Sequence, residues 1–203
     1  MLSPDSSPRY GRGARILHWS IAVLIIAAIV LGIISGTVIG PNTTDPALKG
    51  LRVALLFWHK SIGITILVLG LIRIGWALTH PRPPLPSHLP KRERVLAKGV
   101  HATLYILLIA MPITGILLTQ SVGFPASWFG LVTLPDFVHP DLTVPLFKRT
   151  SVLITFILHE RLFAWLLLAI LTLHIAGLIK HQWFDRDPSI WRRMAPFGER
   201  TPK

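Results

Sequence analysis

The chain has 203 residues, of which 51% are hydrophobic, and its mean hydropathy is +0.57. It contains no cysteine, which excludes disulfides, iron–sulfur clusters and thiolate metal sites. The formal net charge of +12 does not call for nucleic acid, because Lys and Arg beside membrane spans set topology and attract anionic lipid headgroups.

Four apolar segments are long enough to cross a bilayer as helices. They cover roughly residues 16–39, 53–78, 96–121 and 151–180. The loops between them are short and rich in proline and glycine, so residues 1–203 are expected to form a single membrane domain. The fold class predicted is an all-α, up-down bundle of four transmembrane helices. The first apolar run lacks a clear small-residue cleavage site, so we expect it to be retained.

The distribution of Lys and Arg predicts the orientation of the bundle. An even number of spans puts both termini and the loop between the second and third spans on one side. That side carries fourteen of these residues, namely Arg9, Arg12, Arg15, Arg82, Lys91, Arg92, Arg94, Lys98, Lys180, Arg186, Arg192, Arg193, Arg200 and Lys203. The other side carries six, namely Lys49, Arg52, Lys60, Lys148, Arg149 and Arg161. The excess places both termini in the cytoplasm.

Histidines fall near both ends of the predicted spans. His159 and His174 lie on the fourth span, roughly 22 Å apart along a helix. Ionisable side chains inside a membrane are costly and are usually functional. With the predicted topology, His59 and His159 lie at the outer end on different helices. The inner end holds a larger set, which is His18, His101, His174 and His181.

Two histidines on facing helices can clamp the iron of a b-type haem between them and leave it no open position. One such pair at each end accounts for four histidines. A single histidine at a helix end is more often an interfacial or helix-packing residue, but several at matched depths favour a cofactor. A zinc site would need three or four ligands in one small volume, and histidines divided between two membrane faces do not supply them.

Several stretches together resemble the bacterial cytochrome b561 family, a group of small four-helix di-haem membrane cytochromes that includes the superoxide:ubiquinone oxidoreductase called superoxide oxidase. The matching stretches are 15–22 (RILHWSIA), 56–64 (LFWHKSIGI), 71–76 (LIRIGW), 101–118 (HATLYILLIAMPITGILL), 129–135 (FGLVTLP), 158–160 (LHE) and 173–187 (LHIAGLIKHQWFDRD). They span nearly the whole chain.

The resemblance implies two haem b groups inside the bundle. It assigns His18 and His174 to the cytoplasmic haem iron, and His59 and His159 to the outer haem iron. It places His101 and His181 at a ubiquinone pocket on the cytoplasmic side, not as ligands. His181 is a rival to His174 as an iron ligand, because it lies seven residues later on nearly the same helix face.

One departure from the family concerns the spacing on the fourth span. The family usually separates its two ligands there by 14 residues, whereas His159 and His174 are separated by 15. One extra residue turns the pair by about a quarter turn in a regular helix. We therefore expect a π-type turn between Arg161 and Leu173, since such bulges are frequent at functional sites.

The resemblance also implies the activity, which is electron transfer between superoxide at the outer face and ubiquinone. Basic residues near the outer haem would attract the superoxide anion. Lys60 and Arg52 are the two expected to act on the substrate, with Lys49 and Arg161 nearby.

Two other functions remain open from the sequence. The chain can be the quinone-linked cytochrome b subunit of a hydrogenase or reductase, in which case segment 122–150 is the largest surface for a redox partner protein. It can also be a non-redox channel or structural bundle, which would be colourless.

Overall fold

Four long helices dominate the fold, seen here in a computed structural model that describes residues 9–80, 83–84 and 88–196. The helices long and apolar enough to cross a membrane are Arg12–Ile39, Pro46–Thr79, Lys91–Val122 and Thr150–Phe184. Each contains one of the four predicted spans and extends beyond it at most ends. The four-span membrane bundle predicted from the sequence is confirmed at this level.

The first and fourth spans change helix type along their length, whereas the second and third are each a single α-helix. The first is α1 (Arg12–Ile33) followed by the π-helix η1 (Ile34–Ile39). The second and third are α2 (Pro46–Thr79) and α3 (Lys91–Val122). The fourth is divided into α4 (Thr150–Phe156), the π-helix η3 (Ile157–Phe163), α5 (Ala164–Ile179) and the π-helix η4 (Lys180–Phe184).

Local chemistry fixes the helix ends beside the turns. Asp45 caps α2, because its carboxylate accepts from the N–H groups of Ala47 at 2.8 Å and Leu48 at 3.4 Å, and Pro46 suits the first helical position. At the C-terminal end of α3, Gly123 adopts φ +104°, a left-handed conformation that ends the helix.

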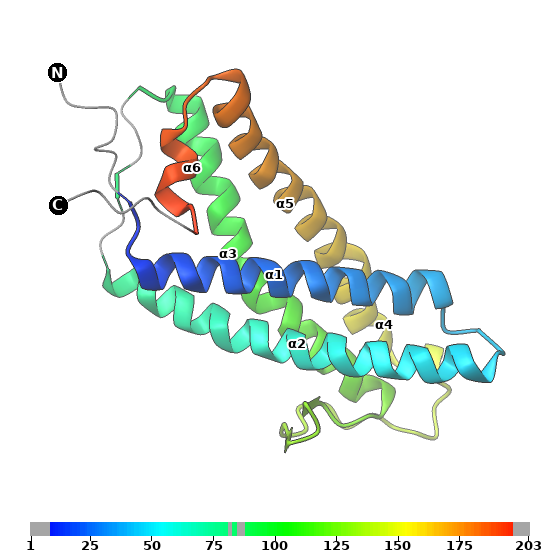
Figure 1. Ribbon diagram of the computed structural model, residues 1–203. Coiled ribbons are helices and arrows are strands. Elements are labelled where there is room, and N and C mark those ends of the chain that lie inside the picture. The colour runs from blue at the N-terminus through cyan, green and yellow to red at the C-terminus, as the bar shows by residue number, and fades with distance from the viewer. Residues whose placement is uncertain (1–8, 81–82, 85–87, 197–203) are drawn as a thin grey trace.

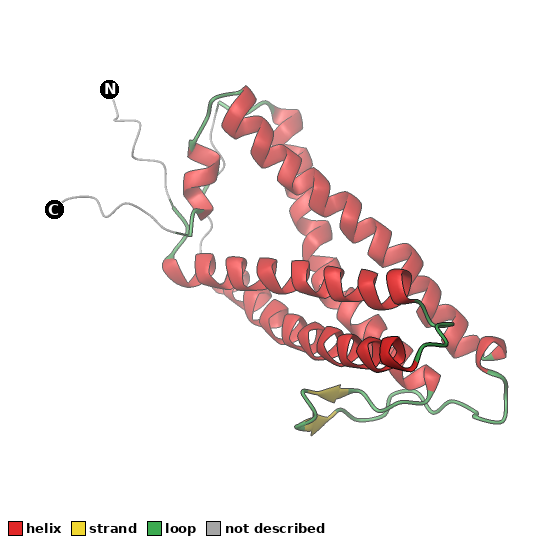
Figure 2. Cartoon of the chain, turned by 45° about the vertical axis from the view of Figure 1, so that its right-hand side comes forward, coloured by secondary structure: helices red, strands yellow, loops and turns green. Residues whose placement is uncertain are grey.

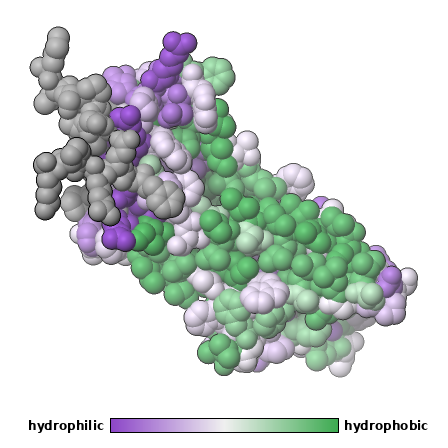
Figure 3. All heavy atoms as spheres, viewed as in Figure 1, coloured by the Kyte–Doolittle hydropathy of each residue, from purple (hydrophilic) through white to green (hydrophobic). Residues whose placement is uncertain are grey.

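The helices pack in chain order. α1 packs on α2, α2 on α3, and α3 on the fourth span, and Figures 1 and 2 show α1 beside α2 as one pair with α3 and α5 forming the other side. A small buried cluster of Ile21, Ile66 and Leu108 joins the first three helices. Gly70 permits this approach, because a Cβ there would lie 2.8 Å from Leu108. The outer surface of the helices is broadly hydrophobic (Figure 3), as lipid contact requires.

Short elements lie outside the four spans. Between α3 and α4 lie a two-stranded antiparallel hairpin, β1 (Ser127–Trp128) with β2 (Val132–Thr133), and the 3₁₀ turn η2 (Leu146–Lys148). The hairpin adds a small β element to the expected all-helical fold. At the end of the bundle where the described residues begin and end, the helix α6 (Ser189–Met194) folds back onto α1.

Helix α6 is tied to three other parts of the chain. The Tyr10 N–H donates to the Arg193 carbonyl at 3.2 Å, and the Trp19 indole donates to the Met194 carbonyl at 2.7 Å. The Arg193 side chain is only 4% exposed and donates to the carbonyls of Pro83 and Pro84, both at 2.7 Å. The two ends of the described chain and the loop between α2 and α3 therefore meet at one end of the bundle.

The fourth span contains the wide turn that the 15-residue spacing predicted. The Ala164 N–H donates to the carbonyl of His159, five residues back, within η3. The wide turn was expected between Arg161 and Leu173, and it begins earlier, at Ile157. His159 therefore lies inside the π segment η3, and its carbonyl accepts the hydrogen bond from five residues later. This wide turn changes the direction in which the side chains of the following helix point.

Candidate haem centres

His59 and His159 face each other at the outer end of the bundle, the end farther from the termini. Their ring centres are 6.1 Å apart and their planes are nearly perpendicular, at 88°. His59 comes from the middle of α2 and His159 from η3, so the pair joins helices that are not neighbours in the chain order. Both histidines are half-buried.

Backbone carbonyls orient both outer imidazoles. The Nδ1 of His59 lies 2.8 Å from the Ala28 carbonyl, and the Nδ1 of His159 lies 3.0 Å from the Met111 carbonyl. A carbonyl only accepts, so each Nδ1 carries the proton and each Nε2 is left with a lone pair. This is the arrangement that metal-bound histidines usually have, with one ring nitrogen on the metal and the other on an outer acceptor.

Two glycines make room for the outer rings. A Cβ at Gly32 would lie 3.1 Å from the Cε1 of His59, and a Cβ at Gly115 would lie 2.8 Å from the Cε1 of His159. The second distance is too short for a real contact. Gly32 and Gly115 therefore accommodate the two imidazoles.

His18 and His174 form the corresponding pair at the inner end. Their ring centres are 6.3 Å apart, with planes at 72°. His18 lies on α1 and His174 on α5. On α1, His18 and Gly32 are 14 residues apart, so the two pairs are separated by roughly 21 Å along the bundle.

The spacing within each pair fits a metal ion between the rings. A metal–imidazole bond is about 2 Å long, and a ring centre lies roughly 1.1 Å behind its nitrogen, so two axial rings on one ion have centres about 6 Å apart. The distances of 6.1 Å and 6.3 Å agree with this value. The residues therefore fit two bis-histidine haem groups, and ligation of iron by these four residues stays a prediction.

His101 and His181 do not lie together. The His101 ring centre is 5.1 Å from that of His174, and its Nδ1 lies 2.6 Å from the Ala97 carbonyl, so His101 adjoins the inner pair. His181 contacts the first turn of α3 instead, with its Nε2 3.7 Å from Glu93. The geometry favours His174 over His181 as the partner of His18.

His181 belongs to an ion cluster at the membrane edge. Its Nδ1 lies 2.8 Å from Asp185, and the Lys180 ammonium bridges Asp185 at 2.7 Å and Glu93 at 2.9 Å. The hydrogen bond from Lys180 holds the pKa of the Asp185 carboxyl below its ordinary value. Three of these residues could gather around a cation, but the Lys180 ammonium already neutralises the carboxylates.

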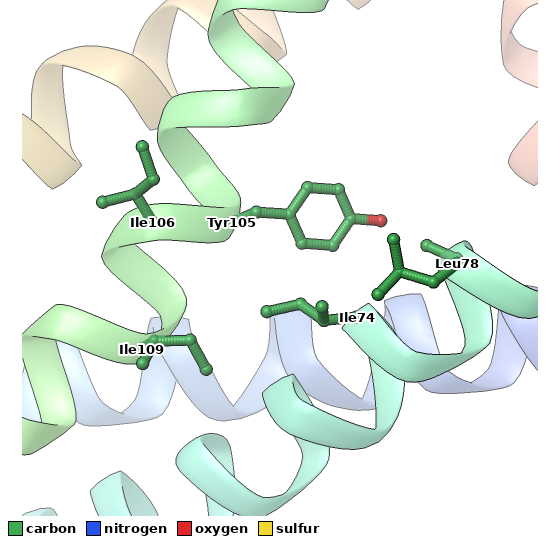
Figure 4. Close-up of a pocket in the computed structure, with 6 residues that line it drawn as sticks. Ile74, Leu78, Tyr105, Ile106 and Ile109 are labelled. Atoms are coloured by element: carbon green, nitrogen blue, oxygen red, sulfur yellow. The ribbon is translucent and has the colours of Figure 1, made fainter.

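A shallow groove of about 360 Å³ lies between α2 and α3, near the inner pair. Figure 4 shows the Tyr105 ring projecting from α3 across the groove toward Leu78, with Ile74, Ile106 and Ile109 beside it. Tyr105 lies one turn along α3 from His101, and the Arg73 guanidinium lies 5.9 Å from the centre of its ring. The groove is apolar except for the tyrosine hydroxyl.

The basic residues predicted at the outer end are placed differently from one another. Lys60 is half-buried beside His59, and Arg52 donates to the Ser35 carbonyl at 3.0 Å, which joins α2 to η1. Lys49 is exposed at the start of α2. The Arg161 guanidinium is exposed and lies 5.7 Å from the centre of the Phe156 ring.

Comparison with known proteins gives a consistent result. The sequence profile of the family described as prokaryotic cytochrome b561 matches residues 9–197. The chain belongs to the prokaryotic cytochrome b561 family. It is 30% identical to the protein named cytochrome b561 homolog 2 of Escherichia coli K12 over 194 residues, which covers 94% of this chain and 93% of that protein. It is 35% identical to the protein named probable superoxide oxidase CybB of Yersinia pestis over 121 residues, which covers 57% of this chain and 61% of that protein.

Membership of the cytochrome b561 family makes the chain a membrane electron carrier and implies haem b. The family resemblance found the histidines from sequence, but it missed the residues that support them. Gly115 and Glu93 were not singled out, because a glycine or a glutamate in a helix carries no signal of what it will face. Tyr105 likewise carries no signal in the sequence, because only the folded structure places its ring in the groove between α2 and α3.

Replacing His59 or His159 with alanine is expected to remove the outer haem and leave the inner one. Loss of one axial ligand breaks a closed bis-histidine site, while His18 and His174, roughly 21 Å away, are unchanged. Haem counted per polypeptide should fall from two to one, with the remaining spectrum that of a six-coordinate b haem. Wild-type protein that carries one haem or none would contradict the assignment.

Replacing Gly115 with alanine is expected to weaken haem binding at the outer centre on the order of 10- to 100-fold, the usual effect of disturbing the support of a metal ligand. The added Cβ would push the His159 ring away from the Met111 carbonyl. Haem titration of the apoprotein measures this change. Gly63→Ala is the matched control, because a Cβ at Gly63 meets no atom within 4 Å, and equal weakening in both variants would contradict the steric account.

Proposed function

We propose that this cytochrome carries two haem b groups, one at each histidine pair, and transfers electrons between superoxide at the outer face and ubiquinone. The observation that carries the proposal is the repeated geometry, with two imidazole pairs at 6.1 Å and 6.3 Å at opposite ends of one bundle. Bound haem supplies one-electron chemistry, and bis-histidine ligation leaves its iron no open position. Substrates are therefore expected to react at the exposed edge of the site.

At the outer end, Lys60 and Arg52 are proposed to attract and hold the superoxide anion. Lys60 follows His59 in α2 and is half-buried, so its ammonium is less screened by water and salt than a fully exposed charge. Arg52 lies two turns earlier on the same helix and is fixed by its bond to Ser35. The relative named probable superoxide oxidase supports this substrate.

At the inner end, we propose that ubiquinone enters the groove between α2 and α3 from the membrane. The apolar groove walls suit an isoprenoid quinone, and His101 lies one turn from Tyr105 toward the inner histidine pair. An imidazole can hydrogen-bond a quinone carbonyl and deliver a proton near neutral pH. His181 is proposed to supply protons from the ion cluster at the membrane edge.

The proposed orientation places both termini in the cytoplasm of a bacterium and the Lys60 end at the outer face of the inner membrane. The excess of Lys and Arg at the termini and at the loop between α2 and α3 supports it. Of the residues in that count, Arg82, Arg200 and Lys203 lie outside the described residues.

Reduction of the bound haem by a superoxide pulse should slow by about an order of magnitude as the salt concentration rises, because electrostatic steering is lost. The Debye length falls from about 10 Å at 0.1 M to about 3 Å at 1 M. Lys60→Gln or Arg52→Gln should lower the rate at low salt and reduce its salt dependence. Stopped-flow absorbance with a quinone acceptor present measures the rate.

Lys148→Gln is the control for that experiment, since Lys148 is exposed in η2 and belongs to the same predicted outer group of basic residues. Haem that stays oxidised with superoxide but is reduced rapidly by quinol or by a co-purifying dehydrogenase would refute the superoxide activity. It would instead favour a cytochrome b subunit that serves a hydrogenase or reductase.

Replacing His101 or His181 with alanine should slow reoxidation of the haem by ubiquinone on the order of 10²-fold, the usual contribution of a positioned proton donor. Both haem spectra should be retained. Stopped-flow reoxidation with a soluble ubiquinone analogue measures the rate. Loss of haem in either variant would show that the residue is a ligand, contrary to the assignment.

A further inference from the structure

The hairpin of β1 and β2 folds back along the side of the bundle. Figures 1 and 2 both show it beside α2, well short of the helix end that lies farthest from the termini. Two hydrogen bonds fix this position. The Phe129 N–H donates to the Ser61 hydroxyl at 3.0 Å, and the Trp128 indole donates to the Thr65 hydroxyl at 3.0 Å.

These contacts lie deep within the apolar part of α2. Ser61 and Thr65 come after His59 in α2, which runs toward the end with the termini. The hairpin therefore extends past the level of the outer histidine pair toward that end. Measured from residue 53, where the predicted apolar span begins, the two residues lie roughly 12 Å and 18 Å along the helix. A hydrocarbon core about 30 Å thick includes both depths.

The composition of the hairpin segment, residues 123–135, matches such a depth. It contains no Asp, Glu, Lys or Arg, and the first charged residue after it is Asp136. The residues at the tip are apolar and exposed, with Leu131 at 85% and Val132 at 50%. Phe124 at the base is also exposed, at 63%. An aqueous loop of this length would rarely leave large apolar side chains uncovered without a charge among them.

Several polar backbone groups of the segment have partners inside the protein. The Leu131 N–H donates to the Trp128 carbonyl at 2.9 Å, and the Leu134 N–H donates to the Ala126 carbonyl at 2.8 Å. The Pro135 carbonyl accepts from the Gln120 side chain at 2.8 Å, and Gln120 is 2% exposed. Pairing of this kind lowers the cost of placing a loop backbone at membrane depth.

We propose that residues 123–135 form a re-entrant hairpin that inserts among the lipid acyl chains from the side of the membrane farther from the termini. Leu131 and Val132 are its lipid-facing tip, and Ser61 and Thr65 of α2 anchor its inner side. The surface is therefore a lipid-binding surface, and this assignment does not depend on the electron donor or acceptor of the cytochrome.

The absence of cysteine allows a direct test with single nitroxide labels. Leu131→Cys is compared with two references in the haem-loaded chain, reconstituted in phosphatidylcholine–phosphatidylglycerol vesicles. Val68→Cys reports on lipid, because Val68 is 41% exposed on α2, two turns beyond Ser61 on the same face. Asp136→Cys reports on water, because Asp136 is exposed just after the segment. Retention of the haem spectrum confirms that each labelled variant is folded.

Collision of the label with oxygen, which concentrates in hydrocarbon, is measured against collision with a water-soluble nickel chelate. The measured quantity is the ratio of oxygen accessibility to nickel-chelate accessibility at each label. This ratio at residue 131 is expected to match the ratio at residue 68 and to exceed the ratio at residue 136 on the order of tenfold, because a polar reagent is excluded from the bilayer core. A label at 131 that behaves like the one at 136 would place the hairpin in water and overturn the proposal. A label shielded from both reagents would show a protein contact at the tip and would also overturn it.

Discussion

Four imidazoles held in an apolar interior are the constraint around which this bundle is organised. A polar ring buried in a membrane protein needs a partner for each nitrogen. For His59 and His159 the carbonyls of Ala28 and Met111 satisfy Nδ1, which leaves each Nε2 with a lone pair. Each of these contacts requires a neighbouring helix to approach closely, and Gly32 and Gly115 allow that approach. The helix spacing at the outer end therefore follows from how the rings are held.

The same constraint explains why the fourth span is irregular. Both of its paired histidines must face helices of the first half of the chain, while the rest of the span packs on α3. In a regular helix, residues 15 apart differ by about 60° in direction. The π segment η3, with its Ala164-to-His159 bond, absorbs the extra residue inside the turn that carries His159. The fourth span is irregular because both His159 and His174 must face the first half of the bundle from one helix.

The two ends of the bundle are built for different surroundings. At the end with the termini, charged groups gather in clusters such as Lys180 with Glu93 and Asp185, and α6 closes over α1 through the hydrogen bond from Trp19 to the Met194 carbonyl. The opposite end has few carboxylates near its histidine pair, and an uncharged hairpin lies along α2. In the proposed function, superoxide and lipid acyl chains meet the second end, whereas protons and the quinone headgroup meet the first.

The sequence by itself determined the membrane spans, their number and the histidines, because a run of about 20 apolar residues has few alternatives to a spanning helix. Family resemblance then identified His18, His59, His159 and His174 as the paired set, and the 15-residue spacing foretold the wide turn. The tertiary structure alone decided that the turn includes His159, that Gly115 faces its ring, that His181 sits with Glu93 rather than with His101, and that residues 123–135 double back along α2. Those features depend on which side chains from distant segments meet, and no local pattern of hydropathy or spacing records that.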